Sequence, residues 1–265
     1  LANWRASAGR VVSLHQDMLA LEPPTPDAEG ARIRFATSRR SELDIRHLHL
    51  TTPTGAVLLE DFNLRLRRGE RILLGGDASV TLALFKAVAG LWPWGRGEIC
   101  LPAGQAAAFL PQQPFLPAGR LRAALCYPRP AEQCADAALE RALECAGIAW
   151  MTPRLEESDD WNRVLPLRAQ QRLGLARVFL EQPAWVFLDD ATNALDLRGE
   201  ACMLEMLSRE LPNTALVNIS QHADLQHLHD RRLELHRAGD AHRATPPTTA
   251  GPTAQASADN RQSEG

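Results

Sequence analysis

The sequence predicts an α/β domain with a mostly parallel core sheet, an antiparallel β subdomain and a helical subdomain. Three observations lead to this prediction. Short, fully apolar runs such as residues 185–188 and 215–219 are typical of strands buried in a parallel sheet. Segments with helical spacing alternate with these runs along the chain. Residues 46–67 instead alternate between apolar and polar side chains, which is the pattern of half-buried antiparallel strands.

The remaining elements follow in chain order from the same patterns. A buried strand is expected at 71–74, a helix at 81–89 and another strand at 107–110. The later elements are helices at 131–146, 170–181 and 198–210 and strands at 185–188, 215–219 and 232–235. Leu73 and Phe187 should then lie in one sheet.

Length and composition suit one soluble domain. The chain has 265 residues, of which 45% are hydrophobic and 23% are charged, enough for a single sizeable core. The net charge of −3 gives no reason to expect a nucleic-acid partner. The five cysteines show no C-x-x-C spacing and suit reduced thiols. No run approaches the ~18 apolar residues that cross a bilayer. Because the chain begins with Leu, we expect the soluble end of a longer chain, or a separated fragment.

The most informative stretch covers residues 75–82, where a phosphate-binding loop is expected between a strand and a helix. Such a loop reads G-x-x-x-x-G-K-[ST]: its backbone surrounds phosphates, its Lys neutralises them and its hydroxyl holds Mg²⁺. Gly75 matches the first glycine, and Ala78 and Ser79 lie inside the loop. The second glycine, the Lys and the hydroxyl residue are replaced by Val80, Thr81 and Leu82.

Further landmarks follow this stretch in order. They are AGLWPWGRGEI at 89–99, FLPQQPFLP at 109–117, QQRLGLAR at 170–177 and WVFLDDATNALD at 185–196, with His222 downstream. Over roughly residues 1–236 the chain resembles the ATPase cassette of ABC transporters. More narrowly, it resembles the fused permease–ATPase branch that includes bacterial peptide and cobalamin uptake systems and peroxisomal fatty-acyl transporters.

The resemblance implies roles for four residues. Asp189 ends an apolar strand and would bind Mg²⁺, and Asp190 stands where the family has a catalytic Glu one methylene longer. Gln112 matches the glutamine that contacts Mg²⁺ and the attacking water and couples to the membrane domain. His222 matches the histidine that contacts the γ-phosphate. For Asp189, Gln112 and His222 the alternative of a strand-end cap or a plain surface residue stays open.

A second departure from the family pattern lies just before the Gln-Gln-Arg run. The family has Leu-Ser-x-Gly-Glu/Gln there, and its Ser and Gly close on the γ-phosphate bound to the opposite subunit. This chain has Leu165-Pro166-Leu167-Arg168-Ala169. Pro166 lacks both the N–H and the hydroxyl, and Arg168 adds bulk where glycine allows close approach.

The resemblance also divides the chain. Residues 1–22 are expected to form a connecting helix after a missing membrane domain, or alternatively a surface helix of the same domain. Residues 23–44 are expected to be a linker and 45–237 the ABC cassette, with its helical subdomain at about 119–165. The tail at 238–265 is expected to be disordered because it holds almost no large apolar residues.

Together these features predict the nucleotide-binding domain of a membrane ABC transporter with a degenerate site. In the family the cofactors are ATP and Mg²⁺, and the partners are a permease and a second cassette, homo- or heterodimeric, at the cytoplasmic face of the membrane. Because losing the Lys forfeits roughly 4 kcal/mol at an effective dielectric near 20, we expect weak or absent ATP binding and hydrolysis. A functional ATPase, an interaction module detached from transport and a decaying fragment stay as alternatives. Restoring Gly, Lys and Ser at positions 80–82 is expected to recover nucleotide affinity.

Overall fold

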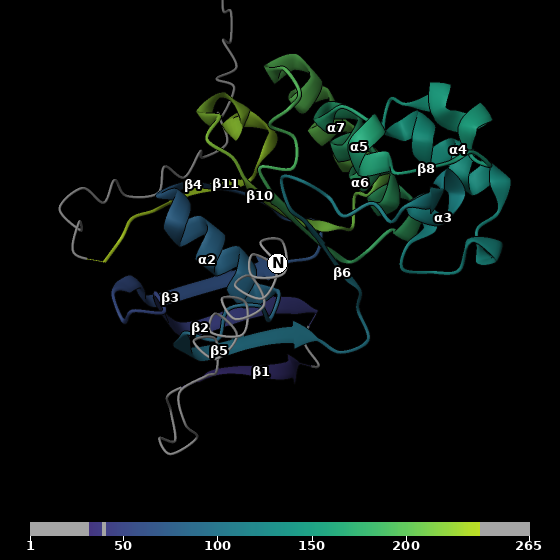
Figure 1. Ribbon diagram of the computed structural model, residues 1–265. Helices are drawn as coiled ribbons and strands as arrows, with labels where there is room; N and C mark the ends of the chain where they lie inside the picture. The colour runs from purple at the N-terminus through teal and green to yellow at the C-terminus, as the bar shows by residue number, and fades with distance from the viewer. Residues whose placement is uncertain (1–31, 39–40, 239–265) are drawn as a thin grey trace, which may run out of the picture.

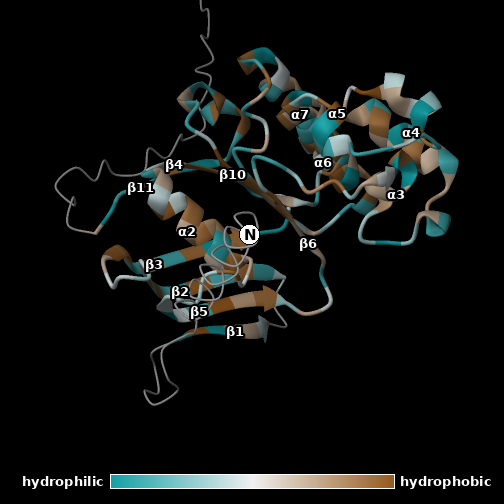
Figure 2. Ribbon diagram, viewed as in Figure 1, coloured by the Kyte–Doolittle hydropathy of each residue, from teal (hydrophilic) through white to brown (hydrophobic). Residues whose placement is uncertain are grey.

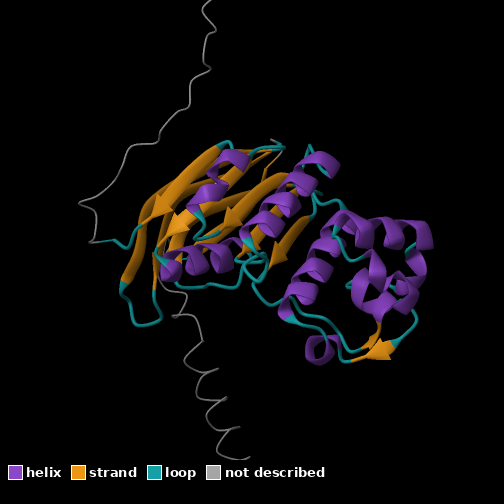
Figure 3. Cartoon of the chain, turned by 90° about the horizontal axis from the view of Figure 1, so that it is seen from above, coloured by secondary structure: helices purple, strands orange, loops and turns teal. Residues whose placement is uncertain are grey.

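The computed structural model describes residues 32–38 and 41–238, which form two sheets with a helix between them and a helical lobe beside them (Figure 1; Figure 3). This arrangement confirms the predicted α/β class. The expected connecting helix at 1–22, part of the expected linker and the tail from 239 onward lie outside the described residues.

The core sheet has five parallel strands in the order β11-β4-β10-β9-β6. They are β4 (Arg71–Gly76), β6 (Ala107–Leu110), β9 (Trp185–Asp189), β10 (Ala215–Ile219) and β11 (Arg231–Leu235). Both faces of β9 and β10 are covered, which explains why these strands are almost wholly apolar. Leu73 and Phe187 lie in this one sheet, on either side of β10, as predicted.

A second, four-stranded sheet has the order β1-β5-β2-β3. β2 (Glu42–Thr51) pairs antiparallel with β3 (Val57–Arg67), as their alternating sequences predict. β1 (Ile33–Ser38) pairs parallel with β5 (Gly95–Pro102), which lies against the other side of β2. Part of the predicted linker at 23–44 is therefore strand. β1 is completed by β5, a partner far along the chain that no local pattern reveals.

The helix α2 (Ala78–Val88) lies between the two sheets (Figure 1). Its buried face packs into a cluster to which both sheets contribute apolar side chains. Figure 2 shows hydrophobic residues on the strands on both sides of it. The helix begins three residues before the predicted start at 81, because Asp77 caps it there.

A helical lobe follows β6 in the chain. It contains α3 (Leu121–Cys126), α4 (Asp136–Cys145), α5 (Trp161–Val164), 3-10 helices at Ala131–Gln133 and Ala149–Arg154, and the paired strands β7 (Gly119–Arg120) and β8 (Ser158–Asp159). α6 (Leu167–Glu181) contacts α3, α4, α5 and β6, and so joins the lobe to the core sheet. α7 (Leu197–Glu210) and the 3-10 helix Ala223–Leu228 complete the described elements. Within the described residues, each helix is too short or too polar to cross a bilayer.

The contact between Gly76 and β11 gives a test of this arrangement. Gly76 has φ +104°, and a Cβ there would lie 2.1 Å from the backbone oxygen of Leu235. We expect Gly76→Ala to lower the free energy of unfolding by about 3 kcal/mol or more, because left-handed backbone and overpacking each cost roughly 1–3 kcal/mol. Gly104→Ala is the control, since Gly104 has φ +71° with open space around it, and should lose only about 1–2 kcal/mol. Equal losses in urea denaturation would contradict the steric explanation.

Candidate functional site

The strand–helix junction at residues 75–79 holds the expected phosphate-binding position in a closed form. β4 runs to Gly76 and α2 begins at Ala78, so Asp77 is the one residue between them. The N–H of Asp77 donates to the backbone oxygen of Leu235 at 2.8 Å, and β11 pairs with β4 as far as Gly76. A Cβ on Gly75 would lie 2.8 Å from the carboxylate of Glu234. The junction backbone is therefore bonded to β11 and flanked by an acid.

The carboxylate of Asp77 lies at the N-terminus of α2. Its Oδ1 accepts the N–H of Ser79 at 2.7 Å and that of Val80 at 3.3 Å, and the Ser79 hydroxyl donates to the same atom at 2.5 Å. The Ser79 hydroxyl bond, with help from these N–H groups, holds the pKa of Asp77 below its usual value. Free N–H groups at a helix start are what binds phosphate, and here a carboxylate of the same chain accepts them.

The packing of α2 determines where the side chains at the three replaced motif positions lie. Val80 is fully buried in the cluster between the sheets, and Thr81 is buried with its hydroxyl donating to the Ala78 backbone oxygen at 3.2 Å. Leu82 is 38% exposed. Two of the residues expected to contact nucleotide thus belong to the core, because α2 turns that face toward both sheets.

Two carboxyl groups meet at the end of β9. Asp189 is the last residue of the strand, and Asp190 follows in a left-handed conformation with φ 47°, uncommon for a residue other than glycine. Burial raises the pKa of Asp189, Asp190 raises it further, and Lys86 opposes the shift. Burial also raises the pKa of Asp190, where Glu200 adds to the shift and His222 opposes it. Asp190 thus lies within electrostatic reach of both Asp189 and His222.

His222 is oriented by a buried acid. Its Nδ1 lies 2.7 Å from Oε2 of Glu200, which is 1% exposed. The other carboxylate oxygen of Glu200 accepts the hydroxyl of Thr192 at 2.7 Å and that of Ser220 at 3.4 Å. Glu200 was not predicted. The sequence feature that points to it is a charged residue on α7 one turn before the buried Met203 and Leu204, where the helical pattern predicts an apolar side chain.

Gln112 lies in the exposed loop at 111–118 that follows β6. Its backbone oxygen accepts the side-chain amide of Gln171 at 2.8 Å. The same buried amide group also contacts Asn193 and Ala194, in the turn at 190–196 after β9. Gln171 had no predicted role beyond its place in the Gln-Gln-Arg run. Its hydrogen bonds to both the loop and the turn were not predicted.

The segment at 165–169 starts α6. Pro166 occupies the N-cap with φ −64°, and its backbone oxygen accepts the N–H of Ala169 at 2.8 Å and that of Gln170 at 3.1 Å. Leu167 and Arg168 are exposed, whereas Leu165 and Ala169 are buried. The exposed helix start therefore presents a proline and an arginine to any facing molecule.

An apolar pocket of about 310 Å³ lies between β6 and the helical lobe. Its lining includes Phe109, Leu110, Pro114, Phe115, Tyr127 and Arg177. Phe115 is 61% exposed and packs edge-on against Tyr127. Burial lowers the pKa of Arg177 to about 10, and its guanidinium donates to backbone oxygens of Phe115 at 2.7 Å and Ala124 at 2.9 Å.

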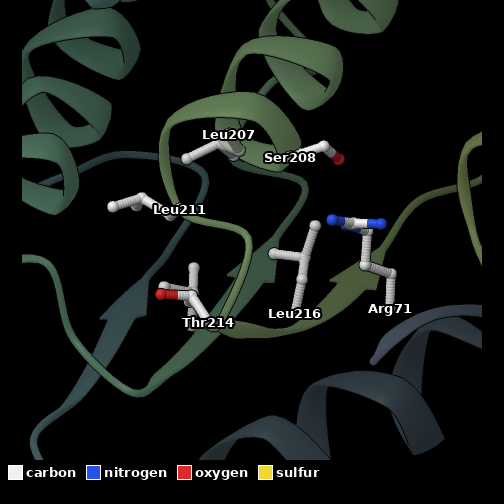
Figure 4. Close-up of a pocket in the computed structure, with 7 residues that line it drawn as sticks. Arg71, Leu207, Ser208, Leu211, Thr214 and Leu216 are labelled. Carbon is white, nitrogen blue, oxygen red and sulfur yellow. The ribbon is translucent and has the colours of Figure 1, made fainter. Parts of the chain in front are cut away.

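A second cavity lies near the starts of β4 and β10, under the end of α7 (Figure 4). Its volume is about 10 Å³, and Arg71, Leu207, Leu211 and Leu216 are among the residues around it. A cavity of this size holds about one water molecule, so it offers no ligand site.

Comparisons with known proteins agree with the fold and place the chain among the ATP-binding proteins of ABC transporters. No protein-family model matches the chain. An uncharacterised ABC transporter ATP-binding protein of Haemophilus influenzae is 33% identical over 200 residues, which are 75% of this chain and 34% of that protein. The lysosomal cobalamin transporter ABCD4 of Mus musculus is 31% identical over 196 residues, 69% of this chain and 32% of that protein. A bacterial Atm1-family ABC exporter with ATP bound matches with a TM-score of 0.65 at 19% identity, covering 80% of this chain and 39% of that one. The chain spans about a third of the length of the curated relatives named here.

The raised pKa of Asp189 predicts how a neutral substitute behaves. Because the pKa is higher in the folded than in the unfolded state, folding stability falls as pH rises from the unfolded pKa, about 3.9, through the folded one. Asp189→Asn removes this ionisation, so we expect a higher melting temperature at pH 7 and a gain that shrinks towards pH 4. Asp224→Asn, at an exposed position, is the control and should show no gain. A gain of equal size at both pH values would mean that the charge is not its cause.

Proposed function

The chain is homologous to the ATP-binding proteins of ABC transporters, and we propose that it is a permease-coupled nucleotide-binding domain whose ATP site no longer functions. The observation that carries this proposal is the closed junction at 75–79. Asp77 is its one connecting residue, and its carboxylate accepts the helix N–H groups that a phosphate needs. The relatives bind ATP by name, so ATP is the ligand whose fit matters here.

The residues present do not fit a triphosphate. The family Lys, worth roughly 4 kcal/mol at close range, is replaced by the buried Thr81. The carboxylate of Asp77 occupies the helix start in its place and repels anions, and Glu234, which pairs with Arg232, flanks the junction. Asp189 and Asp190 remain at the sheet edge, and Asp190 is one methylene shorter than the family Glu. A shift of ~1 Å at a catalytic group can cost ~100-fold in rate.

The face that meets a second cassette supports the same proposal. In the family, each ATP site combines one subunit's phosphate loop with the other subunit's Leu-Ser-x-Gly-Glu/Gln segment. Here that segment offers Pro166 and Arg168 at an exposed helix start, with no N–H at Pro166. A homodimer would then hold two doubly defective sites, and a heterodimer would hold one defect in each site.

The apolar pocket beside β6 supports docking to a permease. Phe115 and Tyr127 are large exposed aromatic side chains at its rim, and residues 111–117 carry three prolines that stiffen the loop. Exposed apolar groups around a pocket are typical of partner surfaces. We propose that the permease, fused or separate, contacts this rim at the cytoplasmic face of the membrane.

Calorimetric titration of the full chain with Mg-ATP tests the central proposal. We expect no binding heat at micromolar ATP and phosphate release at the background rate. The reason is that Asp77 accepts the N–H groups of Ser79 and Val80 and that Thr81 stands in place of the family Lys. A micromolar dissociation constant with steady phosphate release would overturn the proposal in favour of a working ATPase.

The burial of Val80 and Thr81 supports the proposal that Gly, Lys and Ser at 80–82 do not restore affinity, the opposite of what the motif alone predicts. Val80→Gly removes a fully buried side chain and adds a helical glycine, so we expect a loss of about 3 kcal/mol in the free energy of unfolding. Thr81→Lys places a charge in a buried position. The triple variant should therefore melt early and still fail to bind ATP. Leu82→Ser alone, at a partly exposed position, is the control and should lose under ~1 kcal/mol. Tight ATP binding by a stable triple variant would contradict this reading.

Cysteine crosslinking tests the permease contact. In membranes that contain the chain and its permease, Phe115→Cys should crosslink to a cytoplasmic loop of the permease. Thr54→Cys, exposed in the β2–β3 turn of the other sheet, should not. Equal crosslinking at both positions, or none at Phe115→Cys in an assembled transporter, would argue against docking at the pocket.

A further inference from the structure

The side chain of Gln171 connects three segments that are distant in the sequence. It is 1% exposed, near the start of α6. Its amide nitrogen lies 2.8 Å from the Gln112 backbone oxygen, 2.9 Å from Oδ1 of Asn193 and 3.3 Å from the Asp190 backbone oxygen. Its amide oxygen accepts the N–H of Ala194 at 3.0 Å. Both ends of the amide are therefore in use.

These bonds join two segments that follow different strands of the core sheet, β6 and β9. Gln112 belongs to the 111–118 loop, and Asp190, Asn193 and Ala194 belong to the 190–196 turn. Among the residues that the structure describes, every recorded hydrogen bond between this loop and this turn passes through Gln171. Removing the Gln171 amide would leave its partners in the loop and the turn without these hydrogen bonds. The loop, the turn and this side chain are therefore held together as one unit.

The left-handed backbone of Asp190 is a second observation that supports a positioning role for Gln171. A non-glycine residue with φ 47° persists when its surroundings fix it. Its backbone oxygen accepts both the Gln171 amide at 3.3 Å and the N–H of Asn193 at 3.2 Å. Gln171 thus fixes the same turn that carries one of the two acids at the end of β9.

We propose that Gln171 is a positioning residue that makes the 111–118 loop and the 190–196 turn move together without any bound nucleotide. Given the proposed function, on which this part rests, the loop faces a permease. A change at the permease contact then reaches the turn after β9 through a single side chain, by a route that needs no bound ATP.

The neighbouring Gln170 provides a matched control within the same helix. It is 4% exposed, and its amide nitrogen donates to the backbone oxygens of Asn162 and Leu165, each at 2.8 Å. Both partners lie in the segment that enters α6, where the side chain of Asn162 also donates to the backbone oxygen of Leu116 at 2.7 Å. Gln170 therefore has the same side chain and similar burial as Gln171, but it makes no hydrogen bond to the 190–196 turn.

Hydrogen exchange on the full 265-residue chain, without ATP or permease, tests the proposal. Gln171→Leu should raise the exchange of the Ala194 amide, which donates to the Gln171 side chain, about fivefold or more, the factor that one lost hydrogen bond gives. It should also speed exchange of the Phe115 and Leu116 amides, because the loop loses its bond at Gln112. Gln170→Leu should leave the Ala194 amide unchanged. Gln171→Glu keeps the acceptor for Ala194 but loses the donors, so the loop amides should speed up while the Ala194 amide stays protected.

A double substitution measures the coupling itself. Asn193→Gly loosens the turn, and in the unaltered background it should speed exchange of the Phe115 and Leu116 amides. In the Gln171→Leu background it should add nothing there. The proposal is overturned if Asn193→Gly affects the loop equally in both backgrounds, or if Gln170→Leu speeds exchange of the Ala194 amide as much as Gln171→Leu does. Neither result depends on whether ATP binds, so the proposed function can fail separately.

Discussion

The burial of α2 between two sheets is the constraint on which the rest of the structure depends. The helix must present apolar side chains to both sheets, so Val80, Ala83 and Leu84 point into the shared core. Its start is then fixed close to the end of β4, and Asp77 alone spans the gap. β11 seals the other side by approaching the backbone of Gly76. This packing, more than any one replaced residue, sets the backbone geometry of the junction at residues 75–79.

The sequence predicted the core sheet well because its strands are short and uniformly apolar. Trp185–Asp189 and Ala215–Ile219 are buried on both faces, a condition that leaves a clear compositional trace. β1 left no such trace, since an edge strand with exposed residues such as Phe35 depends on a distant partner for its stability. Short helices of the lobe such as α5 were not recognised, because four residues are too few to show a period.

Part of the geometry around the candidate-site residues could be predicted from the sequence, and the departures from it share one cause. Matching residues to a motif assumes that the backbone has the shape the motif needs. Asp189, Asp190 and His222 do come together, because the carboxyl ends of neighbouring parallel strands share an edge. Val80 and Thr81 do not reach that edge, since the helix begins before them and buries them. Glu200 and Gln171 escaped notice because buried polar networks are defined by partners far apart in the chain.

The one-residue junction at Asp77 has a consequence for the evolutionary history of the chain. Each point mutation toward an open loop removes core packing or buries a charge before it creates any affinity for ATP. Variants that lose core packing have less stability to spare, so single substitutions at these positions are costly for the fold. If the proposed loss of ATP binding holds, the packing of α2 makes that loss hard to reverse one residue at a time.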